Sequence, residues 1–383
     1  MKENSSQELA PETLAAQALG IEDRVTGSVI PPIHLSTTYT RTDDYGARET
    51  GTYIRDASPT VKHAEQVVCE LEGGKEALGF GSGLGACTAL FHALENGDHV
   101  AVSRVIYYGV LTWLEEFAEQ RGLSYTLFDN TDLEGLGRIL RSRPTALVWI
   151  ETPANPDWSV TDIAAVSELA HSHGARVAVD STVATPVLTR PLELGADYVC
   201  HSATKFLNGH SDVLGGMLVA ADSESALWDR TRKHRKFAGP MMAAMDAWLL
   251  VRGLRTLFLR IPRQCESALA VASFLAGHSR VERTYYPGLS DDPGYEVASR
   301  QMQGGYGGMV SFQVKGERQD AIDVALKARV FKAATSLGGV ESLIEHRKTS
   351  ESDVTDTPEN LLRVSVGIES ADDLLADLEQ MLG

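Results

Sequence analysis

The segment from His201 to Asp212 contains the side chain with the greatest chemical potential in this sequence, Lys205. This lysine follows a predicted buried strand, stands three residues after Ser202 and adjoins Thr204. A lysine in partly desolvated surroundings has a neutral, nucleophilic amine that can form a Schiff base. Hydroxyl groups beside it are suited to hold the phosphate of a cofactor anchored at that lysine. A surface lysine in a polar loop is the alternative for this residue alone, and the surrounding pattern decides between the two.

Asp180 is the second candidate, at the end of the hydrophobic run 177–180 and 25 residues before Lys205. An acidic residue there lies at the edge of a parallel sheet where α/β proteins bind their ligands. A pyridine cofactor needs a carboxylate beside its ring nitrogen, because the protonated ring is the stronger electron sink. On position alone, a helix N-cap or turn aspartate explains Asp180 equally well.

A third candidate is the small-residue turn from Phe80 to Ala86, which separates a predicted strand from an apolar helix. Small residues let backbone N–H groups approach a phosphate at the positive end of a helix. Because Leu84 interrupts the Gly-x-Gly-x-x-Gly spacing, a dinucleotide site is not indicated. The turn by itself is compatible with close packing as well as with phosphate binding.

The elements that must position these residues alternate between short β-rich runs and amphipathic helical segments. We predict strands over 76–80, 99–103, 124–128, 146–151, 176–180, 198–201 and 215–220, with helices over 111–121, 133–141 and 163–173 between them. Strands that are apolar almost throughout indicate a mainly parallel seven-stranded sheet covered on both faces. The fold class is therefore α/β.

The rhythm changes after about residue 250, where a long helical stretch precedes shorter strands over 309–314 and 361–366. This pattern predicts a smaller C-terminal α+β domain. Residues 1–60 have weak periodicity and are expected to form an N-terminal arm that docks on another surface. The predicted division is an arm over 1–60, a large domain over 61–250 and a small domain over 251–383.

Composition limits the classes of partner. The chain has 383 residues and a formal net charge of -17, which argues against nucleic acid or an anionic membrane surface. No apolar run approaches the length of a transmembrane helix, and the first residues are polar. Four scattered cysteines offer neither a zinc site nor a disulfide framework. We expect a cytoplasmic protein that binds no metal.

Taken together and in this order, the motifs resemble the cysteine/methionine-metabolism family of enzymes that use pyridoxal 5'-phosphate (PLP). The resemblance runs from about Gly27 to the C-terminus. Besides the segments above, it rests on Tyr53-x-Arg55, Tyr108-Gly109, Glu151-Thr152-Pro153-x-Asn155-Pro156, Ser336-Leu337-Gly338-Gly339 and Arg363-Val364-Ser365. It implies the fold-type I architecture of PLP-dependent transferases.

The resemblance also implies roles for single residues. Lys205 would carry PLP as a Schiff base and transfer protons, and Asp180 would pair with the pyridine nitrogen. The phosphate would be held by Gly83, Leu84, Ser202 and Thr204, and by Tyr53 and Arg55 from a neighbouring subunit. Tyr108 would stack on the cofactor ring, with its hydroxyl or that of Tyr53 assisting proton transfer. Asn155, Ser336 and Arg363 would bind the α-carboxylate of the substrate.

Because Tyr53 and Arg55 would act at the site of a neighbouring subunit, the resemblance implies a homo-oligomer, at least a dimer and commonly a tetramer. The expected activity is γ-elimination or γ-replacement on a cystathionine- or homoserine-type amino acid, as in cystathionine γ-synthases and γ-lyases. A cystathionine β-lyase or methionine γ-lyase is the alternative within the family. A catalytically silent relative that serves in binding or assembly is the alternative from another class.

Several positions depart from the pattern of the family and bear on the substrate. Thr335 stands where members acting at the γ-carbon often carry glutamate, and Val110 makes the pocket wall more apolar. Ser58 replaces a common asparagine. After Glu345-His346 the usual Met-Thr-His is absent, and we expect residues 347–352 to form a shortened polar loop.

Overall fold

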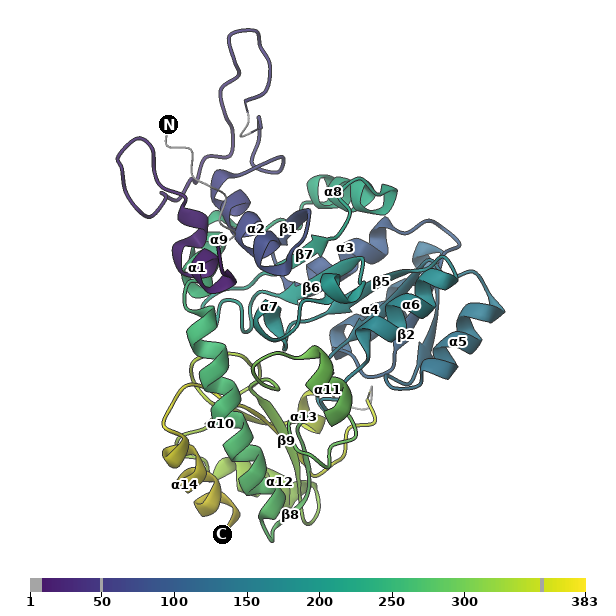
Figure 1. Ribbon diagram of the computed structural model, residues 1–383, viewed down its shortest axis with the longest axis vertical. Coiled ribbons are helices and arrows are strands. Elements are labelled where there is room, and N and C mark those ends of the chain that lie inside the picture. Colours follow the sequence, from purple (N-terminus) through teal and green to yellow (C-terminus); the bar gives the residue numbers. More distant parts are fainter. Residues whose placement is uncertain (1–8, 49–50, 352–354) are drawn as a thin grey trace.

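The computed structural model describes residues 9–48, 51–351 and 355–383, and it contains two β-sheets with helices around them (Figure 1). The larger sheet has seven strands in the order β1-β7-β6-β5-β4-β2-β3. The strands from β2 to β6 pair in parallel, whereas β7 is antiparallel to both β1 and β6. Their bounds are β1 Glu76–Phe80, β2 His99–Ser103, β3 Ser124–Phe128, β4 Leu147–Glu151, β5 Arg176–Asp180, β6 Tyr198–Ser202 and β7 Gly216–Ala220.

Apart from the edge strand β3, both faces of this sheet are buried, which explains why its strands are apolar almost throughout. Along β6, Val199 packs into one hydrophobic cluster, while Tyr198 and Cys200 pack into another on the opposite face. The alternation follows from the two-residue period of a β-strand.

Helices cover both faces of the sheet. On one side α2 packs against α9 and β1, and on the other α3 packs against α8, β6 and β7. The helical segments up to residue 254 are α1 Pro11–Gln17, η1 Ala18–Gly20, α2 Pro59–Glu72, α3 Gly83–Ala93, α4 Tyr108–Phe117, η2 Glu119–Arg121, α5 Leu133–Ser142, α6 Ile163–Ser172, α7 Thr185–Leu188, η3 Pro191–Leu194, α8 Ala226–Ala238 and α9 Ala244–Leu254.

The second sheet has five strands in the order β10-β11-β12-β9-β8 and lies in the lower half of Figure 1, beside the long helix α10. Its own hydrophobic cluster joins α10, α12 and α14 to the strands. The bounds are α10 Leu257–Gly277, β8 Val281–Tyr285, α11 Tyr295–Gln301, β9 Met309–Val314, α12 Arg318–Leu326, β10 Lys332–Ala333, β11 Leu343–His346, α13 Arg347–Glu351, β12 Leu361–Ser365 and α14 Ala371–Leu382.

The described part of residues 21–58 extends away from both sheets as irregular chain (Figure 1). Several apolar side chains on it are exposed, and Val25 is 92% exposed. This agrees with the expectation of an arm that docks on another surface, which stays a prediction.

The predicted architecture is confirmed: an α/β fold with a mainly parallel seven-stranded sheet and a second, smaller sheet region. All seven strands of the large sheet were predicted within one residue of their observed ends. The domain boundaries near residues 60 and 250 stay predictions. The predicted loop over 347–352 is wrong for its first five residues, because Arg347–Glu351 form the helix α13, and Ser352 lies outside the described residues.

Candidate active site

A cavity opens where the carboxyl ends of three neighbouring strands meet the start of α3. Strands β4, β5 and β6 end there with Glu151, Asp180 and Ser202. Because these strands are parallel, their last residues lie at one edge of the sheet. Residues predicted from the sequence that line this cavity are Gly83, Leu84, Asn155, Asp180, Ser202, Thr204 and Lys205.

The first turn of α3 and the end of β6 form a close-packed cradle. A Cβ atom placed on Gly83 would lie 2.7 Å from both Cβ and Oγ of Ser202, so only glycine fits there. Ser82 caps the helix by accepting a hydrogen bond from Gly85 N at 3.0 Å. The free backbone N–H groups of this turn, together with the hydroxyls of Ser202 and Thr204, are suited to a phosphate.

Asp180 is a buried carboxyl group that forms no ion pair within the described residues. Its Oδ1 accepts hydrogen bonds from Thr182 N at 3.0 Å and Thr182 Oγ1 at 2.6 Å. Burial raises the pKa of Asp180 against the opposing effect of these hydrogen bonds. A protonated ring nitrogen would supply the positive charge that this carboxylate lacks.

Lys205 lies at the turn after β6, and its Nζ donates to Ser336 Oγ at 2.8 Å. Burial, with the nearby guanidinium groups of Arg363 and Arg347, lowers the pKa of Lys205 to about 8 against the opposing charge of Glu345. An amine with this pKa is neutral in part of the population near neutral pH, as Schiff-base formation requires.

Arg363 lies on β12 and reaches the same site from the second sheet, with 3% of its surface exposed. Its NH1 donates to Asn155 Oδ1 at 3.2 Å and its NH2 donates to the Ser336 carbonyl at 2.8 Å. Its Nε is buried with no hydrogen-bond partner among the described residues. Burial, with the neighbouring Arg347, lowers the pKa of Arg363 to about 9, which leaves the group charged at neutral pH. A buried guanidinium with an available donor suits a carboxylate ligand.

The tyrosine that lines the cavity is Tyr107, while Tyr108 is absent from its wall. Tyr107 N donates to Glu151 Oε2 at 2.6 Å, which fixes the backbone beside the cavity. Burial raises the pKa of Tyr107 to about 12, so its hydroxyl keeps its proton. Tyr108 packs edge-on against the ring of Tyr107, with 5.0 Å between the centroids. Tyr107 therefore lines the cavity beside Tyr108, and the stacking role of Tyr108 stays a prediction.

The sequence prediction named the neighbouring Tyr108 and did not name Tyr107. The prediction followed the Tyr-Gly pair at residues 108–109, whereas the residue at the cavity is set by its distance from the end of β2. Glu151 was also missed as a site residue. It lines the cavity and accepts from Asn155 N at 3.1 Å as well as from Tyr107 N. Burial and the charge of Asp180 raise the pKa of Glu151 well above its usual range.

Tyr53 and Arg55 lie on the arm and do not line the cavity of their own chain. Both are exposed, and the guanidinium of Arg55 stacks on the ring of Tyr53 at 4.5 Å from its centroid. Their predicted contribution to the phosphate site of a neighbouring subunit stays a prediction.

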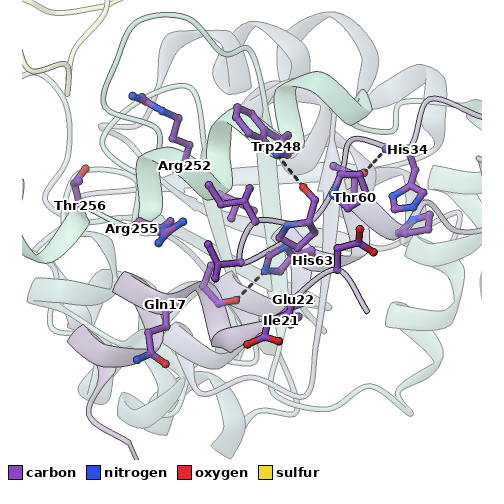
Figure 2. Close-up of a pocket in the computed structure, with 18 of the residues that line it drawn as sticks. Gln17, Ile21, Glu22, His34, Thr60, His63, Trp248, Arg252, Arg255 and Thr256 are labelled. Carbon is purple, nitrogen blue, oxygen red and sulfur yellow. Dashed lines mark hydrogen bonds between the residues drawn. The ribbon is translucent and has the colours of Figure 1, made fainter. Parts of the chain in front are cut away.

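A second, larger cavity of about 500 Å³ lies at the base of the arm, between the arm, α2 and α9 (Figure 2). Trp248 Nε1 donates to the Pro31 carbonyl at 3.3 Å, and His63 Nε2 is 2.8 Å from the Ala18 carbonyl. Neither Lys205 nor Asp180 lines it. It is therefore distinct from the site that carries the chemistry.

The two histidines on either side of Lys205 in the sequence have local hydrogen-bond partners. Buried His201 bonds to Glu72 through Nε2 at 2.5 Å, and His210 Nδ1 is 2.7 Å from the Asn208 carbonyl. Over the described ranges, no group of three or more His, Cys, Asp or Glu residues is arranged to hold a metal ion. Within the same ranges, no helix has both the length and the apolar character needed to cross a membrane.

The residues at the cavity fit PLP on three observations. The start of α3 at Gly83 packs closely against Ser202 at the cavity wall, Asp180 is a buried carboxyl that pairs with no cation among the described residues, and Lys205 has an amine of lowered pKa. Each corresponds to one part of the cofactor: the phosphate, the ring nitrogen and the aldehyde carbon.

Comparison with known proteins agrees with the fit of the cavity to PLP. The family model described as Cys/Met metabolism PLP-dependent enzyme matches residues 12–383. A cystathionine gamma-synthase of Mycobacterium tuberculosis is 42% identical over 379 residues, 97% of each chain. A cystathionine beta-lyase of Coxiella burnetii is 36% identical over the full length of both chains. The solved structure of a cystathionine gamma synthase from Xanthomonas oryzae, in complex with aminoacrylate and cysteine, is 38% identical with a TM-score of 0.93 over 98% of each chain.

Proposed function

The chain belongs to the Cys/Met metabolism PLP-dependent enzymes, and we propose that it catalyses γ-replacement or γ-elimination on a homoserine-derived or cystathionine-type amino acid. The observation that carries this proposal is that Lys205 and Asp180 line one cavity, while Arg363 bonds to Asn155 in its wall and to Ser336, the hydrogen-bond partner of Lys205. The 42% identity to a cystathionine gamma-synthase supports γ-chemistry. The full-length similarity to a cystathionine beta-lyase supports β-elimination as the second candidate.

PLP, when bound, supplies an electron sink that makes the Cα proton of the attached amino acid acidic. Its phosphate would be held by Ser202, Thr204 and the first turn of α3 at Gly83 and Leu84. Asp180 would hold the protonated ring nitrogen, and one of the two adjacent tyrosines at the start of α4 would cover the ring.

Lys205 is the group that moves protons. Its pKa of about 8 allows the amine both to accept a proton from a carbon atom and to return it near neutral pH. The hydrogen bond from Nζ to Ser336 Oγ at 2.8 Å holds the amine beside Ser336, whose carbonyl accepts a hydrogen bond from Arg363. A leaving group at Cγ requires proton removal at Cα and then at Cβ, and one amine can serve both positions.

Arg363 orients the substrate through its α-carboxylate. The planar guanidinium can donate two parallel hydrogen bonds to a carboxylate, which lysine cannot. Asn155 and the Ser336 carbonyl already fix the plane of this guanidinium. We expect Arg363→Lys to raise the KM for the amino acid by about 10- to 100-fold, with little loss of bound cofactor.

The proposal includes a homo-oligomer, at least a dimer and commonly a tetramer, in which Tyr53 and Arg55 complete the phosphate site of a neighbouring subunit. Their exposure and their absence from the wall of the cavity in their own chain support this arrangement. A cytoplasmic location is also proposed, because all four cysteines are free thiols.

A product assay tests the function. Purified enzyme would be incubated with cystathionine, methionine, homocysteine and O-acyl homoserines, with and without cysteine. Formation of 2-oxobutyrate, or of cystathionine from an acyl homoserine and cysteine, would support γ-chemistry. Pyruvate as the main keto acid would instead establish the β-lyase. Lys205→Ala is the matched negative control. A colourless protein whose spectrum does not respond to borohydride would identify a catalytically silent relative.

A further inference from the structure

The helix α13 places charged side chains directly behind the guanidinium of Arg363, the group proposed to bind the substrate carboxylate. Arg347 and Glu351 are its first and last residues and are 2% and 3% exposed, respectively. Charged groups are buried to this extent only when other charges compensate them. The segment expected to be a polar loop is therefore part of the protein interior.

The compensation runs through Glu345. On the paired strands β11 and β12, Glu345 lies directly opposite Arg363. One oxygen of Glu345, Oε2, accepts from Arg363 NH2 at 2.5 Å and from Arg347 NH1 at 2.7 Å. The other, Oε1, accepts from Ser350 Oγ at 2.6 Å. Glu345 thus joins two guanidinium groups, one at the site and one behind it.

Arg347 is itself held in place. Its Nε donates to Glu351 Oε1 at 3.1 Å, and its NH2 bonds to the same oxygen. Thr355 and Thr357 hydroxyls donate to Glu351 Oε2 at 2.9 and 2.5 Å. The position of Arg347 is therefore set from behind, independently of any substrate.

The shared carboxylate determines what Arg363 can offer. Without Arg347, Glu345 would have Arg363 as its only cationic partner and would be free to form a two-point pair with it. That pair would occupy donors needed by the carboxylate of a substrate. With Arg347 present, Glu345 is restrained by three donors, and Arg363 keeps its buried Nε available.

We propose that Arg347 is a positioning residue for the amino-acid substrate, because it restrains Glu345 and so keeps the guanidinium of Arg363 available to the α-carboxylate. The inference rests on the proposed role of Arg363 as the carboxylate-binding group. It assigns a function to Arg347, the first residue of the segment for which the sequence predicted a polar loop.

The test measures preference for a carboxylate in the holoenzyme. Glycine has no leaving group, and glycinamide carries an uncharged amide in place of the carboxylate. Their dissociation constants would be followed through the cofactor absorbance. In Arg347→Met, the ratio of glycinamide to glycine dissociation constants should fall by about 10- to 100-fold, the range expected for loss of a charge-assisted hydrogen bond. For the natural substrate, KM should rise much more than kcat falls.

A double-mutant cycle separates positioning from general damage. Because Arg347 acts through Glu345, adding Arg347→Met to Glu345→Gln should change the ratio by less than about threefold. An equal loss in both backgrounds would overturn the proposal, as would an unchanged ratio in Arg347→Met with a lower melting temperature. If the single variant does not fold, Arg347→Met combined with Glu351→Gln removes both members of the rear pair and is read in the same way.

Two controls identify the source of a failure. Arg235 forms a buried ion pair with Glu65 away from the cavity, so Arg235→Met should lower the melting temperature and leave the ratio unchanged. If the wild-type enzyme shows no preference for glycine over glycinamide, the premise on Arg363 fails. If that preference exists and Arg363→Lys abolishes it, a negative result with Arg347 concerns Arg347 alone.

Discussion

Replacement of Gly83 by alanine should weaken PLP binding while the fold is retained. The added Cβ would lie 2.7 Å from Cβ and Oγ and 2.9 Å from Cα of Ser202. Rotation of the Ser202 side chain could move Oγ, but it cannot move Cβ or Cα, so α3 and the end of β6 must separate. Overpacking of this kind costs about 1–3 kcal/mol. If that cost falls on the bound state, the affinity for PLP drops by about 5- to 150-fold.

The assay is equilibrium dialysis of PLP against apoprotein, with circular dichroism and thermal melting as measures of the fold. Gly277→Ala is the matched control, because a Cβ at Gly277, the last residue of α10, meets no atom within 4 Å. We expect that control to bind PLP as the wild type does. If Gly83→Ala binds PLP within about twofold of the wild type, the turn does not hold the phosphate and the reasoning is refuted.

Three further outcomes are expected. Lys205→Ala should abolish turnover and leave the melting curve of the apoprotein nearly unchanged, and residual activity above about 1% of wild type would contradict its role in proton transfer. Tyr107→Ala should weaken PLP binding by about 3- to 10-fold through lost stacking, whereas Tyr108→Ala should not, and the reverse order would establish Tyr108 as the stacking residue. In apoprotein, the rate at which Lys205 reacts with an amine reagent should rise with pH to a midpoint near 8, because burial and Arg363 lower its pKa and only the neutral amine reacts. Arg363→Met should move this midpoint to higher pH, and a midpoint near that of an ordinary lysine in the unsubstituted apoprotein would show that the amine is solvated.

The sequence alone determined the fold and the chemistry of the cofactor site. Apart from the edge strand β3, the strands of the large sheet are buried on both faces, so their apolar runs stand out from the polar turns and mark their own ends. Asp180 is the last residue of such a strand, and Lys205 stands three residues after the end of another. The turn at Gly83 lies between a strand and a helix. Because parallel strands end at one edge of a sheet, residues far apart in sequence were predicted to meet there.

Tertiary structure decided which tyrosine faces the cavity and what the segment after His346 does. Tyr107 and Tyr108 are adjacent and chemically identical, and only the path of the chain between β2 and α4 distinguishes them. Arg347 and Glu351 are charged residues of the kind usual in surface loops. Their burial depends on partners contributed by other elements. A charge in the interior is stable only beside its counter-charge, and that proximity is a property of the folded chain.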